Sequence, residues 1–140
     1  MSEGYWEHYS HPADMGIRGF GVSKEEAFAQ AALALTAVIA ELSRVRPKRE
    51  VEIRCEEQDD EALFVSWLNA LIYQMVTRNM LFSKFEVDIK GHQLWARAWG
   101  DTLNIEKHRP VVEVKAATYA DLKVVQNKDG HWLAQCIVDV

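Results

Sequence analysis

The sequence predicts an α+β fold, a two-layer sandwich in which two helices pack on one face of a mainly antiparallel sheet. Two long segments, at about 23–42 and from Asp59 to Val76, repeat apolar residues at helical spacing. Residues 85–140 instead alternate apolar and polar side chains in short runs divided by turn residues, which is typical of antiparallel strands. The order of strand, helix, strand, helix and then hairpins also favours this class.

The first two expected strands, at Tyr5–His8 and Ile17–Phe20, flank a segment that combines a histidine, a carboxylate and glycines. Because Pro12 biases its neighbour toward extended backbone and glycines allow tight turns, Asp14 is expected at a strand edge or in a turn. Most Asp residues beside Gly and Pro satisfy local backbone amides. A turn residue is therefore the first interpretation of Asp14, and a functional carboxylate is the second.

The first helix begins at a capping box, in which the hydroxyl of Ser23 accepts from the third amide and Glu26 reaches back. A basic loop around Pro47 follows the helix, and the alternation of Val51–Glu56 then predicts a half-buried strand. The apolar positions of the helix, which recur at helical spacing, are Ala27, Phe28, Ala31, Leu35, Val38, Ile39 and Leu42.

The second helix opens with acidic residues, Asp59 and Asp60, which suit the positive end of the helix dipole. The periodicity assigns Trp67 and Met75 to the core rather than to a ligand pocket. The full apolar stripe consists of Leu63, Phe64, Trp67, Leu68, Leu71, Ile72, Met75 and Val76.

The chain after the second helix is expected to consist of strands joined by turns, with a polar, irregular connection at 100–110. Alternation of apolar and polar residues within each run predicts strands with one buried face. The expected strands are 85–89, 94–99, 111–119 with a continuation to 125 after a bend, and 131–140, and the turns are 90–93 and 127–130.

The composition indicates a single globular domain, residues 1–140, with an ordinary apolar content of 49%. The net charge of -5 argues against a nucleic-acid binder that neutralises phosphates, because such domains are usually basic. Cys55 and Cys136 form neither a disulfide framework nor a CxxC pair. There is no signal peptide, and the most apolar stretch, Ala31–Ala40, is too short for a bilayer, so a cytoplasmic protein without membrane contact is expected.

Standard catalytic motifs are absent from the sequence, which has no nucleophile elbow, Walker A loop, zinc-protease helix or dinucleotide fingerprint. The five histidines are scattered, and His8 and His11 are too close together for a helical metal pair. Because the two cysteines are also far apart in the sequence, a zinc site is disfavoured.

Five blocks of the sequence carry a more specific signal. They are His11-Pro12-Ala13-Asp14-x-Gly16-Ile17, Glu26-Ala27-Phe28-x-x-Ala31-Ala32, Trp67-Leu68-Asn69-x-Leu71-Ile72-Tyr73, Val114-Lys115-Ala116-x-Thr118-Tyr119 and Ile137-Val138-Asp139-Val140. In this order and spacing, and over essentially the whole chain, the blocks resemble the archease family. Any one block is a weak signal, whereas five in order make a specific match.

Archeases are accessory proteins of RtcB-type RNA ligases, which join RNA ends in tRNA splicing and RNA repair. The resemblance implies that this chain is not itself an enzyme, and that it promotes formation of the ligase's covalent guanylate intermediate and multiple turnover. GTP is then used by the partner ligase and is not bound by this chain alone, and contact with RNA is indirect or weak. The family's architecture, an antiparallel sheet carrying two helices, agrees with the predicted fold.

The resemblance also implies a site for a divalent cation. Asp14 corresponds to the aspartate of the family's His-x-Ala-Asp motif. Asp139 and Val140 correspond to its terminal Asp-aliphatic pair, in which the last residue contributes a backbone or carboxylate oxygen. Clustered oxygen ligands of this kind select calcium or magnesium rather than zinc. Candidate polar contacts around the site or toward the ligase, which lie in matching blocks, are His11, Arg109 and Lys115.

Two positions depart from the family pattern. Pro12 stands where threonine is common, a change expected to affect only the local backbone. Ala120 stands where a histidine usually follows Thr-Tyr, so any role of that histidine is absent from this chain.

Two alternative functions stay open. A small metal-dependent phosphoester hydrolase would hold its metal on Asp14 and Asp139. Its general base would be His11 or His108, but the sequence shows no nucleophile constellation. An RNA-binding module is disfavoured by the acidic net charge and would use the basic cluster of Arg44, Arg46, Lys48 and Arg49.

Overall fold

A computed structural model describes residues 4–12 and 14–140, so interpretations that involve residues 1–3 or Ala13 of the His-Pro-Ala-Asp motif lie outside the described residues. The elements follow one another as a β-hairpin, a helix, a strand, a second helix, a second hairpin and several short C-terminal elements. Their bounds are β1 Tyr5–His11, β2 Asp14–Gly21, α1 Lys24–Ile39, the 3-10 helix η1 Leu42–Arg44, β3 Arg49–Glu56, α2 Asp60–Arg78, β4 Met80–Lys90, β5 Gln93–Thr102, α3 Ile105–His108, β6 Ala116–Ala117, β7 Lys123–Gln126 and β8 Trp132–Asp139.

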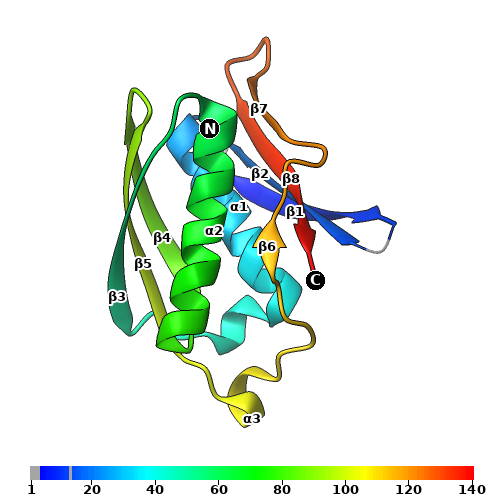
Figure 1. Cartoon of the computed structure of the whole chain (residues 1–140), viewed down its shortest axis with the longest axis vertical. Helices are drawn as coiled ribbons and strands as arrows, with labels where there is room; N and C mark the ends of the chain where they lie inside the picture. The colour runs from blue at the N-terminus through cyan, green and yellow to red at the C-terminus, as the bar shows by residue number, and fades with distance from the viewer. Residues whose placement is uncertain (1–3, 13) are drawn as a thin grey trace.

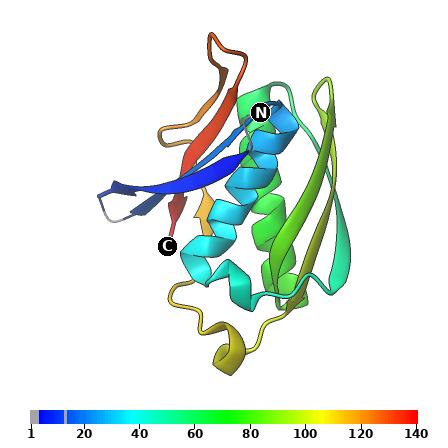
Figure 2. The same cartoon turned by 180° about the vertical axis from the view of Figure 1, so that it is seen from behind.

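The α+β class with antiparallel strands is confirmed, and the strands form two sheets rather than one. The first sheet has the order β1-β2-β8-β6, with β7 also paired to β8, and the second has the order β3-β5-β4. Both long helices, α1 and α2, contact strands of both sheets. Figure 1 and the reverse view in Figure 2 show the helices beside one another, with one sheet on either side.

The composition of α1 explains why it can lie against both sheets. Alanines leave its surface flat, and the backbone of β2 approaches so closely that a Cβ at Gly19 would lie 2.1 Å from the Ala27 carbonyl oxygen. On the other sheet, the Thr36 hydroxyl donates a hydrogen bond to the Phe82 carbonyl at 2.7 Å. The helix is therefore buried on more than one side, and the sheets are held apart by it.

The predicted starts of both long helices are confirmed, but the Glu26 carboxylate binds a different backbone amide from the one expected. The Ser23 hydroxyl accepts from the Glu26 N–H at 3.0 Å, but the Glu26 carboxylate accepts from Val22 rather than from Ser23. Asp59 caps α2 by accepting from the Ala62 N–H at 2.8 Å. The first helix ends at Ile39, earlier than expected, because the chain turns to extended backbone before η1.

The core position of Trp67 and Met75 is confirmed, and Trp67 is fully buried with its indole N–H donated to the Phe28 carbonyl at 3.0 Å. The assignment of Val76 to the same apolar stripe is wrong, since this residue is 66% exposed. It lines an open cleft together with Val111 and Val112. Among the described residues, no helix is long and apolar enough to cross a membrane.

The hairpin of the second half is confirmed and longer than expected, with Gly91 in the left-handed conformation at its turn (φ 61°). The expected strand at 111–119 is wrong for most of its length, because only Ala116 and Ala117 pair with β8. The polar connection before it contains the short helix α3, which has no apolar period. The expected final strand is confirmed as β8.

Candidate functional site

The two aspartates of the expected cation site lie on neighbouring strands. The register of β2 against β8 pairs Met15 with Val138, so the next position along each strand places Asp14 opposite Asp139. Residues directly opposite in an antiparallel pair have Cβ atoms about 4.5–5.5 Å apart. The first and second halves of the site therefore come together although they lie at opposite ends of the sequence.

The neighbouring strands extend this pair into a row of four residues. On one side, His11 of β1 pairs with Asp14, and on the other side Ala116 of β6 pairs with Asp139. The Lys115 N–H also donates to the Asp139 carbonyl at 2.8 Å. We call this the aspartate row, and it consists of His11, Asp14, Asp139 and Ala116.

The aspartates occupy the face of the first sheet that points away from the helices. Side chains alternate between faces along a strand, and the adjacent residues Met15 and Val138 pack in the core. Asp14 is half-buried and Asp139 is exposed. Figures 1 and 2 both show the end of the β1–β2 hairpin projecting beyond the helices, on the side of the molecule where β8 ends.

Strand β6 is held in place by a residue whose role the sequence did not indicate. Asn69 of α2 accepts from the Ala117 N–H at 2.9 Å and donates to the Ala117 carbonyl at 3.3 Å. Thr118 then binds β8 by donating both its N–H, at 3.0 Å, and its hydroxyl, at 2.9 Å, to the Ile137 carbonyl. The Trp-Leu-Asn block is thus connected physically to the Val-Lys-Ala block and to the strand that carries Asp139.

The donor set of the aspartate row fits a hard cation. Two carboxylates facing solvent supply oxygen ligands, and water or Val140 can complete the coordination of calcium or magnesium. Within residues 4–12 and 14–140, no three His, Cys, Asp or Glu side chains gather closely enough to hold a metal ion by themselves. Thiolate ligands are disfavoured, because burial raises the pKa of Cys55 and raises that of Cys136 to about 12, which keeps both thiols protonated.

Arg109, a candidate polar contact of the cation site or of the ligase, lies at the end of α3 and not on a strand of the aspartate row. It ends α3 in the left-handed conformation (φ 48°) and lines an open cleft together with His8 and Arg44. The described lining of that cleft includes neither Asp14 nor Asp139. Lys115 and His11, in contrast, adjoin or belong to the aspartate row.

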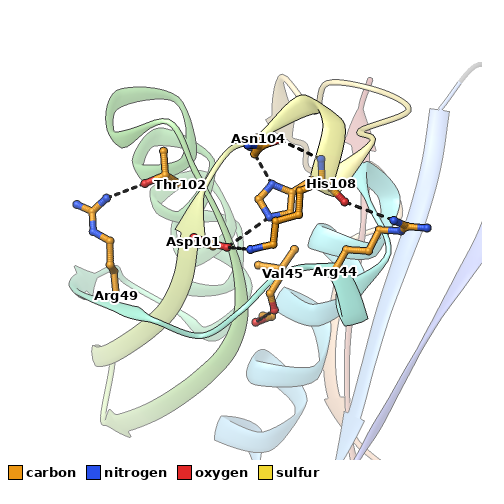
Figure 3. A network of polar contacts seen from close by, with 9 residues as sticks. Arg44, Val45, Arg49, Asp101, Thr102, Asn104 and His108 are labelled. Atoms are coloured by element: carbon orange, nitrogen blue, oxygen red, sulfur yellow. Dashed lines mark hydrogen bonds and ion pairs between the residues drawn. The ribbon is translucent and has the colours of Figure 1, made fainter.

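His108, a candidate general base for a hydrolase, is enclosed by its own partners (Figure 3). Its side chain is 1% exposed, and Nδ1 accepts from the Asn104 N–H at 2.9 Å. Nε2 lies 3.7 Å from the Asp101 carboxylate, which also binds Lys107 at 2.5 Å. The Lys107 ammonium, by this hydrogen bond, lowers the pKa of Asp101. A ring so buried cannot reach a substrate on the aspartate row.

The basic cluster of the RNA-binding alternative is partly engaged within the molecule. Arg44 pairs with Glu41 at 3.2 Å and donates to the Lys107 carbonyl at 3.4 Å. Arg49 donates to the Thr102 hydroxyl at 3.0 Å, as Figure 3 shows. These contacts leave a smaller free basic surface than the sequence alone suggests.

A second cleft, of about 430 Å³, lies between the end of α2 and residues 110–114. Its lining is mostly aliphatic, and Glu113 is the one charged residue among the described residues that form it. The described lining supplies a single carboxylate, Glu113, and no second charged group to act with it. The aspartate row is consequently the surface whose chemistry is most specific.

Similarity to known proteins extends over nearly the whole chain. A sequence model described as the Archease protein family matches residues 6–140. Proteins named archease from Pyrococcus abyssi and Thermococcus kodakarensis are 44% and 43% identical to the chain, and each alignment covers 96% of this chain and 98% of the relative.

Solved structures share the fold. The solution structure of protein 1598 from Methanobacterium thermoautotrophicum aligns with a TM-score of 0.78 and 29% identity, over 96% of this chain and 98% of that one. A crystal structure described as an archease, possible chaperone, from Thermotoga maritima aligns with a TM-score of 0.61 and 17% identity over 96% of both chains. The second similarity shows the fold alone. Taken with the full-length family match and the identity to archaeal relatives, the similarities show that the chain belongs to the archease family.

Proposed function

We propose that this protein is an accessory factor of an RtcB-type RNA ligase, which promotes guanylylation and multiple turnover of the ligase in tRNA splicing or RNA repair. Membership of the archease family is one support for this role. In this proposal GTP is bound and consumed by the ligase, and contact of this chain with RNA is indirect.

The observation that carries the proposal is the aspartate row. It presents two facing carboxylates at an exposed sheet end, where a large partner can approach along the projecting hairpin. Like charges directly opposite on neighbouring strands destabilise a sheet. A pair of this kind at the surface is explained more simply by a ligand of opposite charge than by a contribution to folding.

We further propose that Asp14 and Asp139 hold a calcium or magnesium ion, with an oxygen of Val140 as a third ligand. When bound, the cation would neutralise the two carboxylates and supply a positive centre at the surface that meets the ligase. Asp14 and Asp139 would orient this centre, and Lys115, beside Asp139, would add a positive charge for the partner. His11, in the same row, is exposed and available for a polar contact.

The proposal is tested by measuring guanylylation of the cognate ligase with GTP in the presence of this protein. The protein is added at roughly one-tenth of the ligase concentration, so that each molecule of it must act on several ligase molecules. Wild-type protein should accelerate guanylylation, and Asp14→Asn and Asp139→Asn should lose most of the effect. Asp129→Asn is the matched control, because it removes the same charge from an exposed turn. No acceleration of a cognate ligase, or acceleration only at equal concentrations, would contradict the proposed role.

A further inference from the structure

A polar network beside the aspartate row joins the two strands of the first hairpin to β8 and to the loop after β6. Its members on the strands lie on the same outward face as Asp14 and Asp139, one or two same-face residue pairs further along. None of its members lies within the five blocks that carry the family resemblance. The network consists of Glu7, Tyr9, Arg18, Asp121 and Gln135.

Tyr9 is the centre of the network and the residue nearest to the site. Its ring covers Gly16 so closely that a Cβ there would lie 2.3 Å from the Tyr9 Cζ atom. The guanidinium of Arg18 stacks over the same ring, with Cζ 3.9 Å from the ring centroid. The ring thereby contacts two residues of β2, and Tyr9 itself is two residues from His11.

The hydroxyl of Tyr9 makes the connection that leaves the hairpin. It donates to the Asp121 carboxylate at 2.8 Å. Burial, together with the hydrogen bond and negative charge of Asp121, raises the pKa of Tyr9, so the hydroxyl remains protonated and a donor at neutral pH. Asp121 itself adopts the left-handed conformation (φ 54°), which directs the loop back over the sheet.

Gln135 closes the network on the strand that carries Asp139. It is 2% exposed, and its amide donates to both the backbone and the side-chain oxygen of Asp121, at 3.0 and 3.1 Å. Its carbonyl accepts from the Arg18 Nε at 2.8 Å. Arg18 also pairs with Glu7 at 2.9 Å. Strands β1, β2 and β8 and the loop are therefore linked by one continuous set of hydrogen bonds.

We propose that Tyr9 is a positioning residue for the Asp14–Asp139 pair, an inference that rests on the proposed cation site. The end of the β1–β2 hairpin carries Asp14 and projects beyond the helices (Figures 1 and 2). The Tyr9–Asp121 hydrogen bond holds that end against β8 and keeps the two carboxylates at the separation a shared cation needs. Preorganised ligands bind more tightly because less ordering is required on binding.

The variant Tyr9→Phe isolates this role, since it keeps the ring on Gly16 and under Arg18 and removes only the hydroxyl. We expect it to raise the calcium dissociation constant, measured calorimetrically on the folded protein, about 3- to 10-fold. Hydrogen exchange at the Gly16 amide should become faster. Tyr5→Phe is the control, because Tyr5 lies on the same face of β1, stacks on Phe20 and is 54% exposed. It should bind calcium as the wild type does.

A second pair of variants separates the hydrogen bond from the charge of Asp121. Asp121→Asn retains an acceptor for the Tyr9 hydroxyl and should bind calcium within about twofold of wild type, whereas Asp121→Ala should match Tyr9→Phe. Equal affinities for Tyr9→Phe, Tyr5→Phe and wild type would overturn the positioning role. Asp14→Asn distinguishes the two failures: if it binds calcium normally, the cation site is wrong and the role of Tyr9 falls with it. If Asp14→Asn loses binding while Tyr9→Phe does not, only the role of Tyr9 is wrong.

Discussion

Asn69 gives the sharpest test of how β6 is held beside Asp139. Its amide makes two hydrogen bonds to the backbone of Ala117, at 2.9 and 3.3 Å. Because Ala117 is only 7% exposed, Asn69→Ala leaves its N–H and carbonyl with little access to water. Each lost hydrogen bond costs about 1 kcal/mol, and an unpaired buried group costs more. We expect the free energy of unfolding to fall by about 2–3 kcal/mol.

Urea denaturation measures this loss directly, and the melting temperature should fall by roughly 5–10 °C. Hydrogen exchange at Thr118, whose N–H binds the Ile137 carbonyl, should accelerate because β6 is released. The control is Gln74→Ala on the same helix, which removes one hydrogen bond from Arg78 and should cost about 0.5 kcal/mol or less. If Asn69→Ala lowers the free energy of unfolding by less than about 0.5 kcal/mol and leaves hydrogen exchange at the Thr118 amide unchanged, Asn69 does not hold β6 in place.

Three further predictions follow from the packing. Gly19→Ala should lower the free energy of unfolding by about 3 kcal/mol or more, because its Cβ would lie 2.1 Å from the Ala27 carbonyl oxygen, which cannot move aside; a loss below about 1 kcal/mol in urea denaturation would contradict this close approach. Since burial and Asp121 raise the pKa of Tyr9, its hydroxyl stabilises the fold below the unfolded pKa of about 10, and this contribution is lost as the pH rises further. The stability difference between wild type and Tyr9→Phe should therefore stay constant up to a pH of about 9 and narrow above a pH of about 10. A difference that does not change above a pH of about 10 would count against this contribution. Cys136, fully buried and with a pKa raised to about 12, should react with a thiol reagent only after unfolding; reaction at the rate of a free thiol in the native protein would show that the strand opens.

Much of the fold could be predicted from local patterns. Helical periodicity and the caps at Ser23 and Asp59 locate both long helices, because these signals depend on residues a few positions apart. The strand expected at 111–119 is mostly wrong, because strand pairing depends on residues far away in the sequence. Its apolar residues Val111 and Val112 are exposed, and strand pairing there is decided by how much of the segment β8 can reach.

The candidate site was only partly predictable. The family resemblance identifies Asp14 and Asp139, but their proximity depends on the register of β2 against β8, which no local pattern encodes. The supporting contacts of Asn69 and Tyr9 are equally non-local. The alternation of Tyr5, Glu7, Tyr9 and His11 along β1 was the one available signal that this face carries polar chemistry. The position of Arg109 at the end of α3 could not be predicted either, because the residues there show no helical period.

The separation of the chain into two sheets also required the structure. Alanine-rich helices can pack closely on any apolar surface, and the sequence of α1 does not show which strands will occupy each side. The position of each sheet is set by contacts with α1, which packs against Gly19 of the first sheet and binds the Phe82 carbonyl of the second. The α+β class is unaffected, because each sheet is antiparallel and is covered by the same two helices.

The most direct test of the account is the change in melting temperature on adding calcium to wild type and to Asp14→Asn. If Asp14 and Asp139 hold the cation, wild type should gain about 2.7 kcal/mol of stability at a hundred times the dissociation constant, and Asp14→Asn should gain little. Without calcium, Asp14→Asn should be as stable as wild type or more so, because two facing negative charges become one. Asp129→Asn should respond to calcium as wild type does. Equal calcium shifts in wild type and Asp14→Asn would contradict the cation site and, with it, the role assigned to the aspartate row.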